Sequence, residues 1–473
     1  VLYDRAGNPI NYDLGPNATL FIDQTAPIIN ITTPANGSHG NTAAVAYELT
    51  EAIQSGTIAW GRFAGKEDPN SPHIQTLIGE ELEQGSFAGL ITNNPDLVDS
   101  AIYEIHFTAN ETAGNRIIPY IINSFTFDTL APTFSQLGPD SLDFINNSMV
   151  SYKISEALSS GQVKWTNITP GSENTVSIID LAGDELTVGY AEIGSIELEN
   201  DNPDFFADGE IYNVTWTGID LAGNPTRLDF TSTEVVYDTT RPTAELIYNN
   251  YIVGANYPLI ITVNFSEPMK DDPLINIDYE GIGFDIQDTL LKDPNLNDGT
   301  VWFFNTLVPI ESSISGIAYV YIDAQDLASN PLDSTAYYPN DTLIVDNFLP
   351  SCTLQYINDS QDWLINEGRG DDEILIRGDF NKPITETLPR LNIVYGDTTE
   401  ASFTGLIPTD SAAAGSTFYW EFSLPNDSIN SGSMLVDLLA YDRALSEISP
   451  DSTFNDTIFI VDNIPPALGI TDT

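Results

Sequence analysis

Acidic residues recur at three matched places along this chain, and their chemistry is that of metal ligands. An aspartate stands four residues before a proline at Asp23, Asp128, Asp238, Asp346 and Asp462. A glutamate ends a run of β-forming residues at Glu51, Glu156 and Glu267, and the last copy has Lys382 at this place. A third acid opens a D-x-A-G-N motif or a relative of it at Asp4, Glu111, Asp220, Asp326 and Asp442. Hard oxygen ligands that converge from several loops are what Ca²⁺ uses in proteins.

The spacing of these acids indicates a repeat array. Successive proline-linked aspartates are 105, 110, 108 and 116 residues apart, and a fixed period of this kind marks repeated structural units. We therefore predict four domains, at residues 25–128, 131–238, 241–346 and 349–462. Residues 1–22 are predicted to be the last strands of a preceding domain, and residues 464–473 the start of a following one.

Short β-forming runs alternate with clusters of Gly, Pro, Asn and Asp inside each repeat. Runs such as AAVAYELT (43–50) and YEIHFTA (103–109) favour an antiparallel sandwich of about seven strands per repeat. The Gly-Asn pair of the motif supplies the positive-φ positions of a hairpin that joins the last two strands. Tyr103 and Tyr212 lead the strand before that hairpin, where immunoglobulin-like sandwiches often carry a corner tyrosine. No segment indicates a helix longer than two turns.

The repeats fall into two subtypes, which occur as adjacent pairs. The first two repeats follow their glutamate with SGTIAW and SGQVKW, which places Trp60 and Trp165 on the third strand. The last two carry LINIDY and RLNIVY instead, and their tryptophans come later, at Trp302 and Trp420.

The F-S-E-P and D-x-A-G-N elements, joined by Asp-Thr-Thr-x-Pro linkers, resemble the bacterial immunoglobulin-like domains of giant secreted adhesins. The resemblance covers essentially the whole chain. It implies an all-β fold, in which a tandem array of immunoglobulin-like β-sandwiches forms an elongated rod. These motifs are specific for the class of domain and say little about any binding partner.

Composition excludes several classes of function. The net charge is −54, from 69 acidic and 15 basic residues, whereas a nucleic-acid-binding protein needs clustered Lys and Arg. Such self-repulsion must be screened by salt or neutralised by bound cations. The single cysteine, Cys352, allows no internal disulfide framework. No apolar run approaches the ~20 residues that span a bilayer. The G-x-S-x-G, P-loop and H-E-x-x-H motifs are absent, whereas a carboxylate pair for glycoside hydrolysis stays open in so acidic a chain, although no pair is singled out.

The topology of such a sandwich brings the linker, the end of the second strand and the last hairpin to one end. Three predicted Ca²⁺ sites follow: Asp23, Glu51 and Glu111; Asp128, Glu156 and Asp220; Asp238, Glu267 and Asp326. The alternative is that these acids only form turns or are solvated. At the fourth junction the Lys382 ammonium supplies the cation itself, so we expect weaker calcium binding or none, with Asp346 and Asp442 beside it.

Two glycosylation patterns are also present. Asp followed by Ser or Thr and then an apolar residue or Thr occurs twelve times, as at Asp99 and Asp341, and is similar to the O-glycosylation motif of Bacteroidota. Asn-x-Ser/Thr sequons include Asn17, Asn167, Asn213 and Asn340, where a glycan would indicate a secreted protein. Both patterns would place the protein outside the cell, at the surface.

The sequence favours a non-catalytic stalk segment of an extracellular adhesin or appendage, stiffened by cations between its domains. Two alternatives stay open. In a multi-chain homo-oligomeric fibre, apolar patches would repeat on every domain. In a spacer or carbohydrate-binding array of a secreted enzyme, exposed aromatic residues would form a row on one sheet. The target ligand and the oligomeric state are not specified by the sequence.

Overall fold

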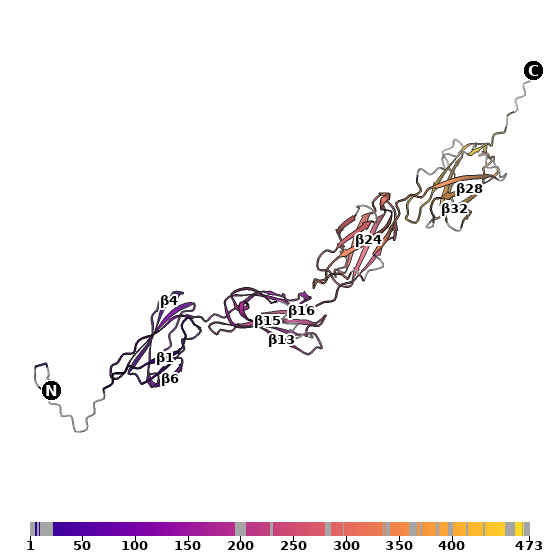
Figure 1. Ribbon diagram of the computed structural model, residues 1–473. Coiled ribbons are helices and arrows are strands. Elements are labelled where there is room, and N and C mark those ends of the chain that lie inside the picture. Colours follow the sequence, from indigo (N-terminus) through magenta and orange to yellow (C-terminus); the bar gives the residue numbers. More distant parts are fainter. Residues whose placement is uncertain are drawn as a thin grey trace, which may run out of the picture. The chain divides into compact units, whose positions relative to one another are not determined.

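The computed structural model describes most of the chain (Figure 1). The described residues are 5–6, 9, 22–193, 205–227, 230–279, 285–296, 298–333, 335, 341–358, 367–368, 371–384, 387–395, 401–412, 415–428, 431–449, 459–465 and 467. The predicted fragments at 1–22 and 464–473 lie mostly outside this set. The chain divides into two compact units, residues 1–238 and 239–473, and each unit contains two hydrophobic cores.

The first sandwich of the first unit packs a three-stranded sheet against a five-stranded sheet, in the orders β1-β3-β6 and β2-β8-β7-β4-β5. Its strands are β1 (Ile29–Thr33), β2 (His39–Gly40), β3 (Val45–Leu49), β4 (Ser55–Gly65), β5 (His73–Thr76), β6 (Gly85–Gly89), β7 (Ala101–Asn110) and β8 (Tyr120–Phe127). A 3-10 turn, η1 (Gly79–Leu82), precedes β6. Alternate residues of β7 are buried, because successive side chains of a strand point to opposite faces.

The second sandwich repeats this arrangement, with sheets β14-β11-β9 and β10-β16-β15-β12-β13. Its strands are β9 (Phe134–Gly138), β10 (Phe144–Ile145), β11 (Val150–Ile154), β12 (Leu158–Asn167), β13 (Val176–Asp180), β14 (Gly189–Ile193), β15 (Ile211–Asp220) and β16 (Phe230–Tyr237). The 3-10 turn η2 (Gly183–Leu186) stands where η1 stands in the first sandwich.

The third sandwich, in the second unit, has a fourth strand in its smaller sheet. The two sheets are β17-β19-β23-β22 and β18-β25-β24-β20-β21. Its strands are β17 (Ala244–Tyr248), β18 (Ile252–Val253), β19 (Pro258–Phe265), β20 (Leu274–Tyr279), β21 (Asp285–Thr289), β22 (Leu291–Lys292), β23 (Val301–Leu307), β24 (Gly316–Asp323) and β25 (Thr342–Val345). A 3-10 turn, η3 (Ser312–Ile314), precedes β24.

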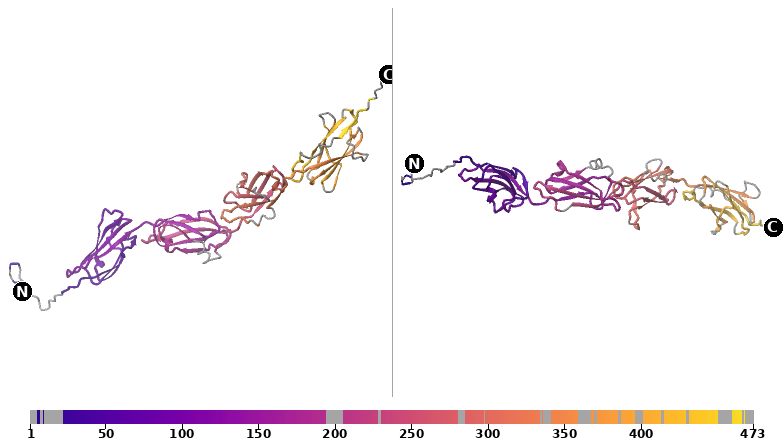
Figure 2. Two further views of the ribbon diagram at one scale, coloured as in Figure 1. Left: turned by 45° about the horizontal axis from the view of Figure 1, so that its top comes forward. Right: turned by 90° about the horizontal axis from the view of Figure 1, so that it is seen from below.

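The fourth sandwich matches the third, with sheets β26-β28-β32-β31 and β27-β34-β33-β29-β30. Its strands are β26 (Cys352–Asn358), β27 (Glu367–Gly368), β28 (Glu373–Phe380), β29 (Arg390–Tyr395), β30 (Ala401–Leu406), β31 (Asp410–Ser411), β32 (Thr417–Ser423), β33 (Gly432–Leu439) and β34 (Phe459–Val461). In both units the strands of each core form separate sandwiches (Figure 1; Figure 2).

One feature of strand pairing is common to all four sandwiches. A two-residue strand leaves the first sheet and pairs in parallel with the last strand of the opposite sheet, as β2 with β8, β10 with β16, β18 with β25 and β27 with β34. Without two-residue strands, each sandwich has seven described strands, as predicted. The tandem β-sandwich fold is therefore confirmed.

The two predicted subtypes are confirmed by the position of the tryptophans. Trp60 and Trp165 lie on β4 and β12, in the five-stranded sheets, and both are fully buried. Trp302 and Trp420 lie on β23 and β32, in the four-stranded sheets. The additional strand beside them, β22 or β31, distinguishes the second subtype.

The predicted corner tyrosines are confirmed in the first two sandwiches. Both side chains are fully buried. The Val98 amide donates to the Tyr103 hydroxyl at 2.8 Å, and the Tyr212 hydroxyl donates to the Phe205 carbonyl at 2.8 Å. Each hydroxyl thus ties the start of its strand to backbone a few residues upstream.

Among the described residues, no helix is long and apolar enough to cross a membrane.

Candidate functional site

The predicted acids of the first unit converge at one end of each sandwich. In the second sandwich, Asp128 lies between β8 and β9, Glu156 follows β11, and Asp220 ends β15. The antiparallel pairing of β9 with β11 places Phe134 opposite Ile154, so the entering linker lies beside the end of β11. One carboxylate oxygen from each acid lies within 4.8 Å of the others, and the same holds for Asp23, Glu51 and Glu111.

Within the second unit, Glu267 and Asp326 hold the corresponding places after β19 and β24. Their carboxylate oxygens lie within 4.8 Å of each other. Asp326 is fully buried and accepts hydrogen bonds from the backbone and side-chain amides of Asn330, at 2.8 and 2.9 Å. Asp238 is the last residue of the first unit.

The hairpin acid of each set is fixed by its own turn. The Asp220 side chain is buried, and Oδ1 accepts hydrogen bonds from the amides of Ala222 and Asn224, both at 2.8 Å. Asn224 Nδ2 donates to Asp220 Oδ2 at 2.8 Å. Both oxygens of this carboxyl group therefore accept hydrogen bonds from the turn that follows it. The Gly-Asn turn therefore positions this acid as well as shaping the hairpin.

The same asparagine ties the hairpin to the linker. Asn224 Nδ2 also donates to the carbonyl of Asp128 at 2.9 Å, and Asn41 Nδ2, from the first sandwich, donates to Asn224 Oδ1 at 3.0 Å. In the first set, Asn115 Nδ2 lies within hydrogen-bond distance of Glu111 and donates to the Asp23 carbonyl at 3.1 Å. From the sequence alone, these asparagines are predicted only to form turns. The recurrence of asparagine at the last position of the D-x-A-G-N motif was the sequence signal that this side chain positions the hairpin acid and the linker.

Replacing Asn224 by alanine should lower the stability of the second sandwich by about 2 kcal/mol. This change leaves Asp220 Oδ2 and the Asp128 carbonyl each without a donor, and a buried polar group without its partner costs about 1–3 kcal/mol. Calorimetric unfolding of the whole chain measures the change. Asn305→Ala is the control, because Asn305 is exposed on β23 of the third sandwich. Equal effects of both variants would show that Asn224 does not position the junction.

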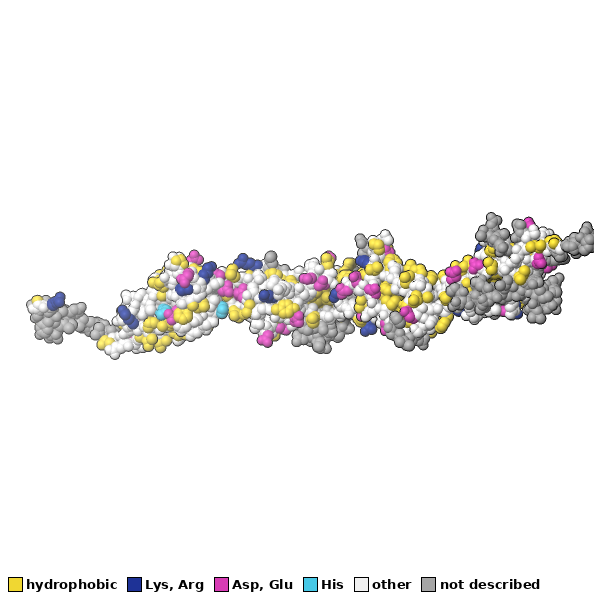
Figure 3. All heavy atoms as spheres, turned by 90° about the horizontal axis from the view of Figure 1, so that it is seen from above, with side chains coloured by type: hydrophobic (Ala, Val, Ile, Leu, Met, Phe, Trp, Pro, Cys, Tyr) yellow, Lys and Arg dark blue, Asp and Glu magenta, His cyan; other side chains and the backbone are white. Residues whose placement is uncertain are grey.

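The acids of the first two sets have no basic partner. Among the described residues of the first unit, none of these six carboxyl groups forms an ion pair with Arg or Lys, and Figure 3 shows Asp and Glu side chains at many places on the described surface. Burial, followed by the charges of Asp128 and Asp220, raises the pKa of Glu156 to about 7. Burial and the charges of Glu111 and Asp23 likewise raise the pKa of Glu51.

The raised pKa of Glu156 predicts a pH-dependent stability in the absence of divalent cations. Because the folded-state pKa of about 7 exceeds that of the unfolded chain, the native state binds the extra proton between these values. Stability should therefore fall as pH rises toward 7 and become constant above it. Melting in chelator between pH 5.5 and 8 tests this, and Glu156→Gln should flatten the slope. An unchanged slope in that variant would remove Glu156 as the cause.

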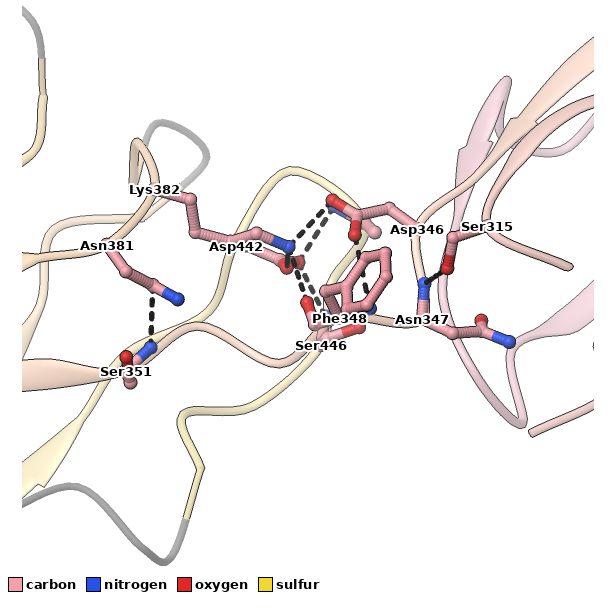
Figure 4. A network of polar contacts seen from close by, with 10 residues as sticks. Ser315, Asp346, Asn347, Phe348, Ser351, Asn381, Lys382, Asp442 and Ser446 are labelled. Atoms are coloured by element: carbon pink, nitrogen blue, oxygen red, sulfur yellow. Dashed lines mark hydrogen bonds and ion pairs between the residues drawn. The ribbon is translucent and has the colours of Figure 1, made fainter. Parts of the chain in front are cut away.

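The fourth junction has an ammonium group where the other sets have a glutamate carboxylate (Figure 4). Lys382 follows β28, and its Nζ lies 2.7 Å from Asp346 Oδ2 and 2.9 Å from Asp442 Oδ2. It also donates to the carbonyl of Phe348, two residues after the linker aspartate. The predicted arrangement of Asp346 and Asp442 around Lys382 is confirmed. A cation thus occupies this position as part of the chain itself.

No protein-family model and no curated protein matches this chain. Among solved structures, the chain is similar to FdeC, an adhesin of Escherichia coli, with a TM-score of 0.32, 10% identity, and coverage of 68% of this chain and 96% of that one. Dimeric latent PorU from Porphyromonas gingivalis aligns with a TM-score of 0.17 and 11% identity, over 74% of this chain and 36% of that one. An alpha-L-rhamnosidase from Dictyoglumus thermophilum aligns with a TM-score of 0.18 and 8% identity, over 71% of this chain and 50% of that one. Scores this low define no family for the chain.

Proposed function

We propose that this chain is a non-catalytic stalk segment of a large extracellular adhesin or surface appendage, in which Ca²⁺ stiffens the first three junctions. One observation carries the proposal. Lys382 Nζ lies between Asp346 and Asp442, at the place where Glu51, Glu156 and Glu267 stand in the other sets. The fourth junction contains its own cation, whereas the acids of the first two sets form no ion pair with Arg or Lys among the described residues.

The donor chemistry of the three sets fits a hard cation. Each set offers carboxylate oxygens from three chain segments, and the contact between Lys382 and the Phe348 carbonyl supports a further oxygen from the linker backbone. Ca²⁺ accepts six to eight oxygen ligands in flexible geometry, and extracellular modules bind it at about 10⁻⁴–10⁻³ M. When bound, the ion would supply positive charge that removes the repulsion among the three acids. Asp128 and its counterparts then hold the linker against two loops of the following sandwich.

Calcium stoichiometry tests the proposal directly. The whole chain should bind three Ca²⁺ ions in isothermal titration calorimetry at physiological ionic strength. Glu51→Gln, Glu156→Gln and Glu267→Gln should each remove one ion, because the substitution halves the oxygen donors of that side chain and deletes its charge. Glu245→Gln, an exposed glutamate in a strand, is the control. Weak uptake that none of the three substitutions reduces would identify the acids as turn and surface residues.

A fibre built from several chains is the second candidate. Large apolar side chains are exposed on all four sandwiches. At the outward position before the end of the last strand, however, the third and fourth sandwiches have Ile344 and Ile460, 48% and 42% exposed, where the first has Thr126. The second sandwich has Val236 there, so this position is apolar in three sandwiches and polar in the first. A fibre packed along its whole length would need the apolar residue on all four, which favours the single stalk.

The proposed location is extracellular, on a glycosylated surface protein of the Bacteroidota type. The hydroxyl residues of the described Asp-Ser/Thr motifs are exposed at all positions but Thr342, which is half-buried in β25; the exposed ones are Ser100, Thr129, Ser141, Thr239, Thr289, Ser411 and Ser428. Accessible hydroxyls are what a glycosyltransferase acting on the folded chain requires. The Asn167 sequon is different, because this side chain is buried and its amide donates to Glu210 at 2.7 Å. We therefore assign no glycan to Asn167.

A further inference from the structure

A cavity of about 480 Å³ lies in the second unit, between the start of the third sandwich and the last hairpin of the fourth. It is lined by Asn250, Tyr251, Ile252, Ile344, Arg443 and Leu445. Ile252 of β18 and Ile344 of β25 pair in parallel and together form one wall. The turn after β33 forms the other wall with Arg443 and Leu445. Its volume falls within the range of about 300–1,000 Å³ that is typical of small-molecule sites.

The cavity contains a cation without an acidic partner. Arg443 is exposed and belongs to none of the ion pairs that Arg and Lys form among the described residues. Most basic residues that the structure describes likewise form no ion pair, so Arg443 is distinguished by its place in the cavity wall. Its planar guanidinium can bind a carboxylate through two parallel hydrogen bonds.

A second departure from the local rules lies beside Arg443. Leu445 has φ 60°, where the first two sandwiches place Gly114 and Gly223 at φ 88° and 89°. A bulky residue at positive φ is uncommon, and it persists only where the surrounding structure holds it in place. Leu445 is nevertheless 45% exposed, so burial does not explain the choice. Its side chain instead forms part of the apolar wall of the cavity.

The remaining walls combine an aromatic ring with an amide. Tyr251 is 48% exposed, and its ring centroid lies 5.1 Å from that of Tyr248, which supports the ring from one side. Asn250 Oδ1 accepts a hydrogen bond from the Ile252 amide at 3.3 Å, so Asn250 Nδ2 is the group that can donate to a ligand. Ile252, Ile344 and Leu445 supply apolar surface around these groups.

We propose that this cavity binds a sugar residue that carries a carboxylate, such as a uronic acid. Arg443 pairs with the carboxylate, the exposed Tyr251 ring packs against the apolar face of the sugar ring, and Asn250 donates to a hydroxyl. An aliphatic carboxylate would use Arg443 but neither Asn250 nor the aromatic ring, so the saccharide is the ligand that uses all three. The proposal is independent of calcium, because neither Lys382 nor the three-acid sets contribute to the cavity.

Saturation-transfer NMR with the whole chain tests this, with methyl glucuronide as the probe and methyl glucoside and N-acetylglutamate as comparison ligands. Methyl glucuronide should bind at least tenfold more tightly than either, in calcium and in chelator alike. Arg443→Gln should weaken it about tenfold, because a charge-assisted hydrogen bond contributes more than 1.4 kcal/mol. Tyr251→Leu should also weaken it.

Arg116→Gln is the matched control, since Arg116 is exposed in the first sandwich and takes part in none of the Arg and Lys ion pairs of the described residues. This variant should bind the glucuronide normally, and thermal melting confirms that each variant is folded. Equal binding of glucuronide and glucoside would overturn the proposal, as would an equal loss in both arginine variants. Equal binding of N-acetylglutamate would instead assign the cavity to acidic peptides, and no binding at millimolar glucuronide would remove the site.

Discussion

Lys382→Met should destabilise the fourth sandwich by about 3 kcal/mol, the low end of the cost of breaking a buried ion pair from one side. The Asp442 side chain is 2% exposed, whereas those of Lys382 and Asp346 are 19% and 32% exposed, so most of the cost comes from Asp442. Oδ1 of Asp442 would keep its bonds from the amides of Ala444 and Ser446, at 2.9 Å each. Its charge would nevertheless have no counter-ion. Calorimetry of the whole chain measures the shift of this transition.

Lys382→Glu makes the prediction sharper, because it converts the fourth set into three acids like the others. In chelator it should be less stable than Lys382→Met, since a third carboxylate adds repulsion to the two that remain. Added Ca²⁺ should recover most of the loss in Lys382→Glu and little in Lys382→Met. Lys153→Met is the control, because Lys153 is exposed on β11 and should change stability by less than about 0.5 kcal/mol. If Lys382→Glu were as stable in chelator as the native chain, the cation at this position would be irrelevant.

Much of this structure follows from the spacing of a few residue types. The period of the aspartate-proline linkers, together with alternating strands such as β7, was enough to predict the sandwiches. The ion pairs of Lys382 followed from one substitution at a repeated position, since a base beside two acids has an obvious geometry. Repetition made these predictions possible, because each copy of the motif constrains the interpretation of the others.

Other features had no comparable signal in the sequence. The parallel strands β2, β10, β18 and β27 are two residues long, too short to show a periodicity. The bond from Asn224 to the Asp128 carbonyl joins residues 96 positions apart, and only the packing of linker against hairpin reveals it. The cavity at Arg443 combines residues from two sandwiches, each of which is unremarkable in its own repeat. Such features depend on tertiary placement, which the local pattern does not encode.

Calcium should stabilise residues 25–238 strongly and residues 241–462 little. The first segment contains one complete three-acid set, Asp128, Glu156 and Asp220, and the second contains only the Lys382 junction. A cation that binds the folded state alone stabilises it by about 2.7 kcal/mol at a hundredfold excess over Kd, which corresponds to a melting shift on the order of 10 °C for a domain of about 100 residues.

Calorimetry of both segments in calcium and in chelator measures this difference, and small-angle scattering measures the bending at each joint. Residues 25–238 should melt earlier and sample more bent conformations in chelator, because the three acids then repel one another across the linker. Residues 241–462 should be insensitive, since the Lys382 ammonium remains in place. Glu156→Gln in the first segment should abolish its response to calcium. If both segments ignored the metal, the acids would be ordinary turn residues, and stiffness would rest on the Asn224 and Lys382 contacts alone.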